Sequence, residues 1–426
     1  MISIREIGTN NFDSVPVDPF WNLGDEVEKK MHRIHAYPAK FPAFITTKAL
    51  EYAREHNIQA NIVSDIFCGC GTVAYETKRN NLEFWGCDIN PVATMIASAK
   101  SRKYQPGRLK RYYEEVLTSF YAIDSDGSYT NANARLVYWY PQEQYENLFS
   151  LKAAIEKATP ANSDYRLFFI CAFSNILKAT SRWLTKSIKP QVDPDKVPAD
   201  VIKAFQNQVE QMMKANLESD LEGDSPVNIE TGNFLSPALE PPVSQIIISS
   251  PPYVTSYEYA DLHQLSSLWL GYAEDYRELR NGSIGSCQHD YQLDEGLEGL
   301  NESGRNTVNR LIEDYNAKAR SVAKYFLDMQ AIAEKSFGML DNNGMALFVI
   351  GNTEYKGVRI NNAEHLAESL QDAGFDDVLV TKRKISKKIL TPYRDKKGCF
   401  TTDSSGRKVY SEEFIVIGRK QWGETH

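Results

Sequence analysis

The sequence predicts an α/β fold with a doubly wound, mostly parallel sheet, and three observations support this. Short runs of branched apolar residues, such as 246–248, are typical of buried parallel strands. A Gly-x-Gly turn at 69–71 joins a strand to a helix, as in nucleotide-binding βα units. Amphipathic helical patterns separate the strands along a chain of 426 residues, which is long enough for one large domain with an insertion or for two domains.

The composition is that of an ordinary globular protein, with 42% hydrophobic and 24% charged residues. The sequence contains no apolar run that approaches the length of a membrane span, and its polar N-terminus has no signal-peptide core. Its six cysteines suggest no disulfide framework. We therefore expect a protein of the reducing cytoplasm, without a membrane partner.

Residues 1–100 carry the features of a nucleotide site. A strand at 61–65 ends in Asp65, and the glycines at 69 and 71 let the backbone pass close to a ligand. A second strand, at 84–87, ends in Asp88, where a carboxylate can accept hydrogen bonds from ribose hydroxyls. A phosphate-binding loop is the rival interpretation, but the turn lacks the lysine and the longer glycine spacing of a P-loop.

Metal binding was weighed for two pairs of residues near this turn. Cys68 and Cys70 lie within it, and His32 and His35 precede it at helical spacing. No second cysteine pair completes a zinc site, and the two prolines that follow the histidines argue against a long helix there. We therefore expect no metal.

Residues 101–225 carry helical periods and no strong strand pattern, so a helical insertion is expected between the second and third strands of the sheet. One amphipathic stripe recurs every four residues, at Val201, Phe205, Val209, Met213 and Leu217. The α/β pattern resumes at about residue 226 and ends with strands at 344–350, 378–382 and 414–417. The chain thus divides into 1–100, 101–225 and 226–426.

The strand at 246–249 stops at Ser250, Pro251, Pro252 and Tyr253. These residues offer a hydroxyl, a rigid backbone carbonyl and a stacking ring at a strand end, where open α/β sheets place their chemistry. Such a group suits a flat heterocycle that is held by its exocyclic amine. An ordinary strand end broken by prolines is the simpler alternative.

This tetrapeptide resembles the catalytic motif of the S-adenosylmethionine-dependent DNA amino-methyltransferases, which modify cytosine N4 or adenine N6. The segments 32–45, 61–72 and 228–235 resemble other motifs of that family, so by this resemblance the chain is identified as a member of it. The resemblance implies a Rossmann-like sheet that ends in an antiparallel hairpin, with S-adenosyl-L-methionine as cofactor. The cofactor-binding residues that it implies are His35, Tyr37, Lys40, Phe41, Pro42, Asp65, Phe67, Gly69, Gly71, Thr72, Asp88, Ile89, Asn233, Phe234 and Ser250.

The catalytic residues implied are Ser250, Pro251, Pro252 and Tyr253, which would act on a base that is flipped out of double-stranded DNA. Serine at the first motif position goes mostly with cytosine N4 in this family, and adenine N6 is the alternative. An RNA or protein amino-methyltransferase and a non-catalytic DNA-binding protein are further alternatives. A cognate restriction endonuclease is an expected partner. Residues 101–225 are a candidate target-recognition region, although their place before Asn233 departs from the family order.

The formal net charge of −8 is unevenly distributed. Residues 381–408 carry +8, which leaves about −16 on the rest of the chain. A concentrated basic segment can bind DNA phosphates, and a solvated loop is the alternative. Because the strand at 378–382 is expected to run parallel to the catalytic strand, the basic loop should leave at the same sheet edge. The predicted DNA-binding residues are Lys382, Lys384, Lys387, Lys388, Arg394, Lys396 and Lys397.

Overall fold

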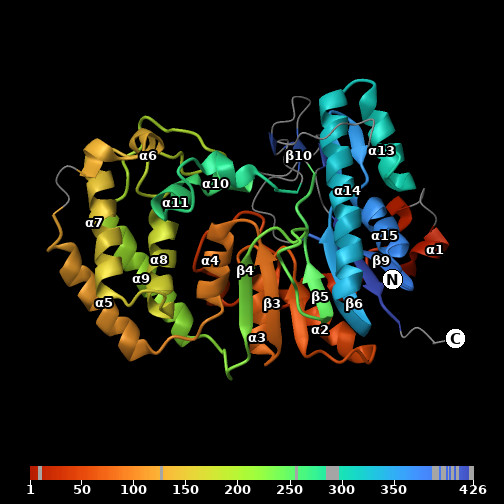
Figure 1. Ribbon diagram of the computed structural model, residues 1–426, viewed down its shortest axis with the longest axis horizontal. Coiled ribbons are helices and arrows are strands. Elements are labelled where there is room, and N and C mark those ends of the chain that lie inside the picture. Colours follow the sequence, from red (N-terminus) through yellow and green to blue (C-terminus); the bar gives the residue numbers. More distant parts are fainter. Residues whose placement is uncertain are drawn as a thin grey trace.

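The computed structural model (Figure 1) describes residues 1–7, 12–124, 128–254, 258–284, 297–385, 393–394, 400–401, 403, 407–408 and 412–421. Within these residues the chain forms an eight-stranded sheet with helices on both faces, and a helical body lies beside one edge of the sheet. The predicted α/β class is confirmed. None of the described helices combines the length and the apolarity that a membrane crossing needs.

Five parallel strands carry the sequence motifs. Their order across the sheet is β4 (Val227–Thr231), β3 (Glu83–Asp88), β2 (Ile62–Asp65), β5 (Ser244–Ser249) and β6 (Leu340–Ile350). Strands β2 and β5 are direct neighbours although they are far apart in the sequence. Their carboxyl ends therefore bring the glycine turn and the tetrapeptide to the same edge of the sheet.

The other end of the sheet is antiparallel, as the resemblance implies. Strand β13 (Glu412–Arg419) lies between β6 and β9 (Asp377–Lys384) and pairs antiparallel with both. Two antiparallel steps restore the original direction, so β9 runs parallel to β5 and ends at the same sheet edge. Strand β1 (Ile2–Ser3) pairs antiparallel with β9. The fold is thus the expected mostly parallel sheet with a closing hairpin.

Both faces of the central strands are buried, which explains their continuous apolar runs. In β5, Ile246 and Ile248 pack with helices α2 (Ala43–Glu55) and α3 (Thr72–Arg79), whereas Ile247 packs into the cluster on the opposite face. This alternation follows from the two-residue period of a strand.

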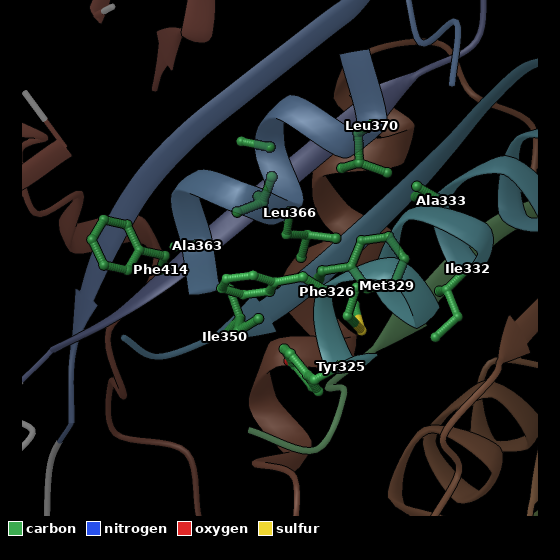
Figure 2. Packing of buried hydrophobic residues seen from close by; sticks show 14 of the residues in the cluster. Tyr325, Phe326, Met329, Ile332, Ala333, Ile350, Ala363, Leu366, Leu370 and Phe414 are labelled. Carbon is green, nitrogen blue, oxygen red and sulfur yellow. The ribbon is translucent and has the colours of Figure 1, made fainter. Parts of the chain in front are cut away.

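The opposite face is covered by α13 (Glu302–Ile312), α14 (Asn316–Met339) and α15 (Asn362–Asp372). Figure 2 shows Phe326 of α14 and Leu366 of α15 in this cluster. Burial of such side chains contributes about 1.5–3 kcal/mol each, so these helices hold the sheet rigid beneath its carboxyl edge.

The helical body is formed by α5 (Pro106–Phe120), α6 (Ala134–Trp139), α7 (Gln142–Ala158), α8 (Asp164–Ile176) and α9 (Val201–Leu217). It follows α4 (Pro91–Lys100) and enters between β3 and β4, as predicted.

The stripe predicted on α9 holds for its first four positions. Val201, Phe205 and Val209 are buried, Met213 is half-buried and packs against the same cluster, and Leu217 is 64% exposed. Four residues turn a helix by about 400°, so a strict four-residue stripe drifts away from the core.

The remaining short elements are α1 (Ile4–Ile7), α10 (Tyr259–Leu262), α11 (Gln264–Trp269), β7 (Thr353–Tyr355), β8 (Val358–Ile360), β10 (Tyr393–Arg394), β11 (Phe400–Thr401), β12 (Arg407–Lys408) and the 3₁₀ turns Phe12–Ser14, Pro19–Trp21, Lys30–Arg33, Ser128–Asn131 and Tyr276–Arg280.

Candidate active site

The glycine turn leads from β2 into α3. Gly69 and Gly71 have φ angles of +47° and +72°, a region that residues other than glycine rarely adopt. A Cβ on Gly71 would also lie only 2.5 Å from the Cβ of Ala97 in α4. Both backbone conformation and close helix packing therefore require glycine at position 71.

Asp88 at the end of β3 faces this turn. Its Oδ2 accepts a hydrogen bond from the Gly69 N–H and its Oδ1 accepts one from the Asn90 N–H, each at 2.9 Å. Burial raises the pKa of Asp88 to about 6, while these two hydrogen bonds oppose the rise. Each carboxylate oxygen has a further lone pair, so Asp88 can also accept hydroxyl groups of a ligand.

Asp65 and Ser249 join the glycine turn directly to the catalytic strand. The Ser249 hydroxyl donates to Asp65 Oδ1 at 2.6 Å, and the Phe67 N–H lies 3.1 Å from Asp65 Oδ1 and 3.2 Å from Ser249 Oγ. Burial raises the pKa of Asp65 to about 7, against the effect of these hydrogen bonds. Phe67, a predicted cofactor residue, thus fixes the turn through its backbone.

The tetrapeptide follows immediately. The Ser250 hydroxyl donates to the Val349 carbonyl of β6 at 2.9 Å. Because its only hydrogen is engaged there, the Ser250 oxygen can meet any further group only as an acceptor. Pro251 is buried and Pro252 is half-buried, and the two rings restrict the backbone that presents the Pro251 carbonyl.

Tyr253 lies against the turn that follows β6. A Cβ on Gly351 would be only 3.1 Å from Tyr253 Cε2, so glycine makes room for the ring. The phenol donates to Glu413 Oε1 at 3.4 Å, and Glu413 in turn pairs with Arg383 across strands β13 and β9. Burial, followed by the nearby Glu413 carboxylate, raises the pKa of Tyr253 well above its usual value. The phenol is therefore neutral.

Tyr37 brings the N-terminal segment onto the glycine turn. A Cβ on Gly69 would lie 3.5 Å from Tyr37 Cε1. The Tyr37 ring stacks on His263, with 5.1 Å between ring centroids, and lies 6.1 Å from the Tyr259 ring at a small interplanar angle. Burial lowers the pKa of His263 to about 3, so its ring is neutral. Trp269 is only 5% exposed and packs in the helical core.

The two histidines that were weighed as metal ligands have separate partners. His35 Nε2 lies 3.0 Å from the Ser174 hydroxyl of α8, and burial lowers the pKa of His35 to about 4. His32 Nε2 lies 2.6 Å from a Glu76 carboxylate oxygen. His35 therefore serves to connect its segment to the helical body.

The other three predicted cofactor residues of this segment have structural contacts. Lys40 Nζ lies 2.7 Å from a Glu28 carboxylate oxygen and donates to the His32 carbonyl at 2.9 Å. Phe41 packs against the cluster around α2, and Pro42 is the N-cap residue of that helix. These contacts hold the segment in place beside the turn.

Asn233, Ile89 and Gly282 lie together beside Asp88. The Asn233 amide donates to the Gly282 carbonyl at 3.1 Å, and a Cβ on Gly282 would lie 3.4 Å from Ile89 Cδ1. The Gly232 N–H donates to the Asp88 carbonyl at 2.9 Å, which ties the Asn233 loop to the end of β3. The glycine turn, Asp88 and Asn233 thus form one continuous surface.

Two predicted cofactor residues support the site from the core. Phe234 is 1% exposed and Thr72 is 2% exposed. The Lys335 ammonium lies 5.0 Å from the centre of the Phe234 ring. A side chain that contacts a cofactor must be accessible in the cofactor-free chain, so these two side chains do not offer such a surface.

The basic segment requires one correction. Lys382 was predicted to contact DNA, but it is only 7% exposed because its strand is buried, and its ammonium donates to the Asp13 carbonyl at 2.8 Å. Lys384 is exposed at the end of β9, and Arg394 lies in β10. The remaining predicted residues lie outside the described part of the chain, namely Lys387, Lys388, Lys396 and Lys397.

Sequence reasoning missed three residues that complete the site: Ser249, Gly282 and Glu413. The first could have been suspected because it is a polar residue at a strand end. The other two gave no local signal, since their partners Asn233 and Tyr253 lie far away in the sequence.

Comparison with known proteins gives sequence relatives that match most of this chain. The Type II methyltransferase M.MvaI of Kocuria varians is 23% identical over 394 residues, which is 86% of each chain. The Type II methyltransferase M.AvaI of Nostoc sp. is 22% identical, covering 74% of this chain and 73% of its own. No model of a known protein family matches the chain. A solved structure, the rRNA methyltransferase AviRa from Streptomyces viridochromogenes, covers 91% of this chain and 89% of its own at 10% identity, with a TM-score of 0.28, which is too low to support an argument.

The sequence relatives are methyltransferases, which confirms the resemblance that the motifs indicate. They imply S-adenosylmethionine as the methyl donor, as predicted.

Proposed function

We propose that this protein is a DNA methyltransferase that transfers a methyl group from S-adenosylmethionine to N4 of a flipped-out cytosine. The printed names of the relatives, both Type II methyltransferases, support DNA as the substrate. They also support a role beside a cognate endonuclease in a restriction-modification pair. The observation that carries the proposal is the acceptor-only Ser250 hydroxyl, whose neighbour Ser249 bonds to Asp65 at the start of the glycine turn.

S-adenosylmethionine, when bound, supplies a methyl group on an electrophilic sulfonium. The residues present fit this cofactor. Gly69 is half-buried and has no side chain of its own, so a ligand can approach the backbone of the turn, and Asp88 has lone pairs for the ribose hydroxyls. The Asn233 amide lies on the same surface, where it is suited to the adenine edge.

The residues of the tetrapeptide would activate the target amine. An exocyclic amine is a poor nucleophile because its lone pair is delocalised into the ring. The Ser250 oxygen and the Pro251 carbonyl would each accept one amine N–H, which favours a pyramidal nitrogen with a lone pair aimed at the methyl group. The bond to Val349 fixes Ser250 in this acceptor role before substrate arrives. The transfer is then a direct in-line displacement that depends on positioning.

Tyr253 would stack on the base, as the base must leave the duplex to reach this pocket. The neutral serine at position 250 supports cytosine N4 over adenine N6, by its resemblance to the family motif. Residues 101–225 are proposed to recognise the target between the cofactor half, 1–100, and the catalytic half, 226–426. Lys384 at the end of β9 is proposed to bind phosphates together with Lys387, Lys388, Arg394, Lys396 and Lys397.

The test is to incubate the protein with unmethylated DNA and labelled S-adenosylmethionine, and to analyse the digested nucleosides by mass spectrometry. N4-methylcytosine is expected. N6-methyladenine would contradict the base assignment, and methylation of RNA alone would contradict the substrate.

The Tyr253→Ala variant should lose base stacking of about 1–3 kcal/mol and most turnover, while its affinity for S-adenosylmethionine stays normal. Tyr272→Ala, at a position that is 38% exposed and lies outside residues 101–225, is the matched control. A Tyr253→Ala enzyme as active as this control would contradict the mechanism.

A further inference from the structure

We infer that Asn175 of α8 and Gln208 of α9 are positioning residues for the cofactor, because they hold the segment that places Tyr37 over the glycine turn. This inference rests on the proposed function. It assigns to the helical body a role in cofactor binding that is separate from any recognition of DNA.

The two amide side chains bind the backbone on both sides of His35. Gln208 Nε2 donates to the Ile34 carbonyl at 2.6 Å, and Asn175 Oδ1 accepts the Ala36 N–H at 2.9 Å. The two side chains also bond to each other, since Asn175 Nδ2 donates to Gln208 Oε1 at 2.7 Å. Gln208 is only 6% exposed, so water cannot readily replace its hydrogen bonds.

The His35 side chain adds a third connection to the same helices. Its Nε2 lies 3.0 Å from Ser174 Oγ, which is in turn 2.7 Å from Ser266 Oγ of α11. Three consecutive residues, 34 to 36, are thus bonded to the helical body. A backbone held at three successive positions has little freedom to move.

Tyr37 is the next residue, and its ring lies over Gly69 and stacks on His263. The helices therefore set the position of Tyr37, a side chain of this segment that contacts the glycine turn. Ordering a segment before a ligand arrives removes the entropy cost that the ligand would otherwise have to offset. Loss of the amide contacts should accordingly weaken cofactor binding without affecting the chemical step.

The experiment uses the full chain and three variants. Gln208→Met removes the hydrogen bonds with little change in volume, and Asn175→Leu does the same at a half-buried position. Asn207→Leu, at the exposed neighbouring position of α9, is the matched control. Calorimetry with S-adenosylmethionine should show binding weakened on the order of tenfold in the first two variants and unchanged in the control.

Two further measurements separate positioning from a general loss of structure. Hydrogen exchange of the Ala36 amide in the cofactor-free protein should accelerate in both variants, while the amides of β2 and β5 keep their protection. The KM for S-adenosylmethionine should rise while kcat at saturating cofactor stays at the wild-type value.

Wild-type affinity in a folded Asn175→Leu or Gln208→Met protein would overturn the inference. If the buried Gln208→Met variant does not fold, the Asn175→Leu variant decides. Failure of the wild-type protein itself to bind S-adenosylmethionine would instead overturn the proposed function.

Discussion

The raised pKa of Asp88 predicts that cofactor binding depends on pH near 6. Burial is the main cause of the raised pKa, and the N–H groups of Gly69 and Asn90 oppose it. Ribose hydroxyls donate hydrogen bonds and so favour the ionised carboxylate. The cofactor should therefore bind the protein whose Asp88 is ionised, and the pKa of Asp88 should be lower in the complex.

The magnitude follows from the ionised fraction. With a pKa of about 6, about nine tenths of the Asp88 carboxylates are ionised at pH 7 and about one tenth at pH 5. If only the ionised form binds, the dissociation constant for S-adenosylmethionine should rise about tenfold from pH 7 to pH 5. Because the folded-state pKa exceeds the ordinary 3.8, ionisation of Asp88 costs folding stability as pH rises through the interval between the two values. Bound cofactor should offset that cost, so its effect on the melting temperature should be greatest above pH 6.

Calorimetry between pH 5 and pH 8 at constant ionic strength measures this dependence. The Asp88→Asn variant cannot titrate at this position, so it should bind more weakly and with a flatter pH profile. Any pH dependence of the dissociation constant that remains in this variant would report the ionisation of Asp65. Burial raises the pKa of Asp65 to about 7. A wild-type dissociation constant that does not change between pH 7 and pH 5, in protein that melts normally, would refute the assignment of Asp88.

Three further predictions concern stability, the phenol contact and DNA binding. Gly71→Ala should lower the free energy of unfolding by about 2–5 kcal/mol, from left-handed backbone strain and overpacking. Urea denaturation checks this against Gly107→Ala, which has open space for a Cβ and should not be destabilised. Glu413→Gln should lower the free energy of unfolding by about 3–5 kcal/mol, because buried Arg383 loses its charge partner. The variant should also have a lower turnover at saturating cofactor, and a wild-type rate would argue against a role of Glu413 in holding Tyr253. Neutralising four lysines should flatten the salt dependence of DNA binding by about 0.9 in log–log slope per lost phosphate contact, and an unchanged slope would make this segment a solvated loop. These lysines are Lys387, Lys388, Lys396 and Lys397.

The amino-acid sequence by itself determined the parts of the protein that depend on local interactions. The apolar runs predicted β2, β3, β5 and β6 because a strand buried on both faces has no polar alternation. The turn at Gly69 and Gly71 was predicted because its backbone conformation excludes other residues. The tetrapeptide from Ser250 and the carboxylate of Asp88 were recognised because both stand immediately after predicted strands.

Only the tertiary structure decided which polar groups meet across the fold. Asp65 and Ser249 are 184 positions apart, and Gln208 and Ile34 are 174 apart. Their hydrogen bonds arise from strand order and helix rotation, and helical drift along α9 was enough to expose Leu217. Lys382 shows the same limit, since its charge suggested a DNA contact while its place within β9 buried it. The environment of a side chain depends on contacts from segments that are distant in the sequence. Local residue patterns do not predict those contacts.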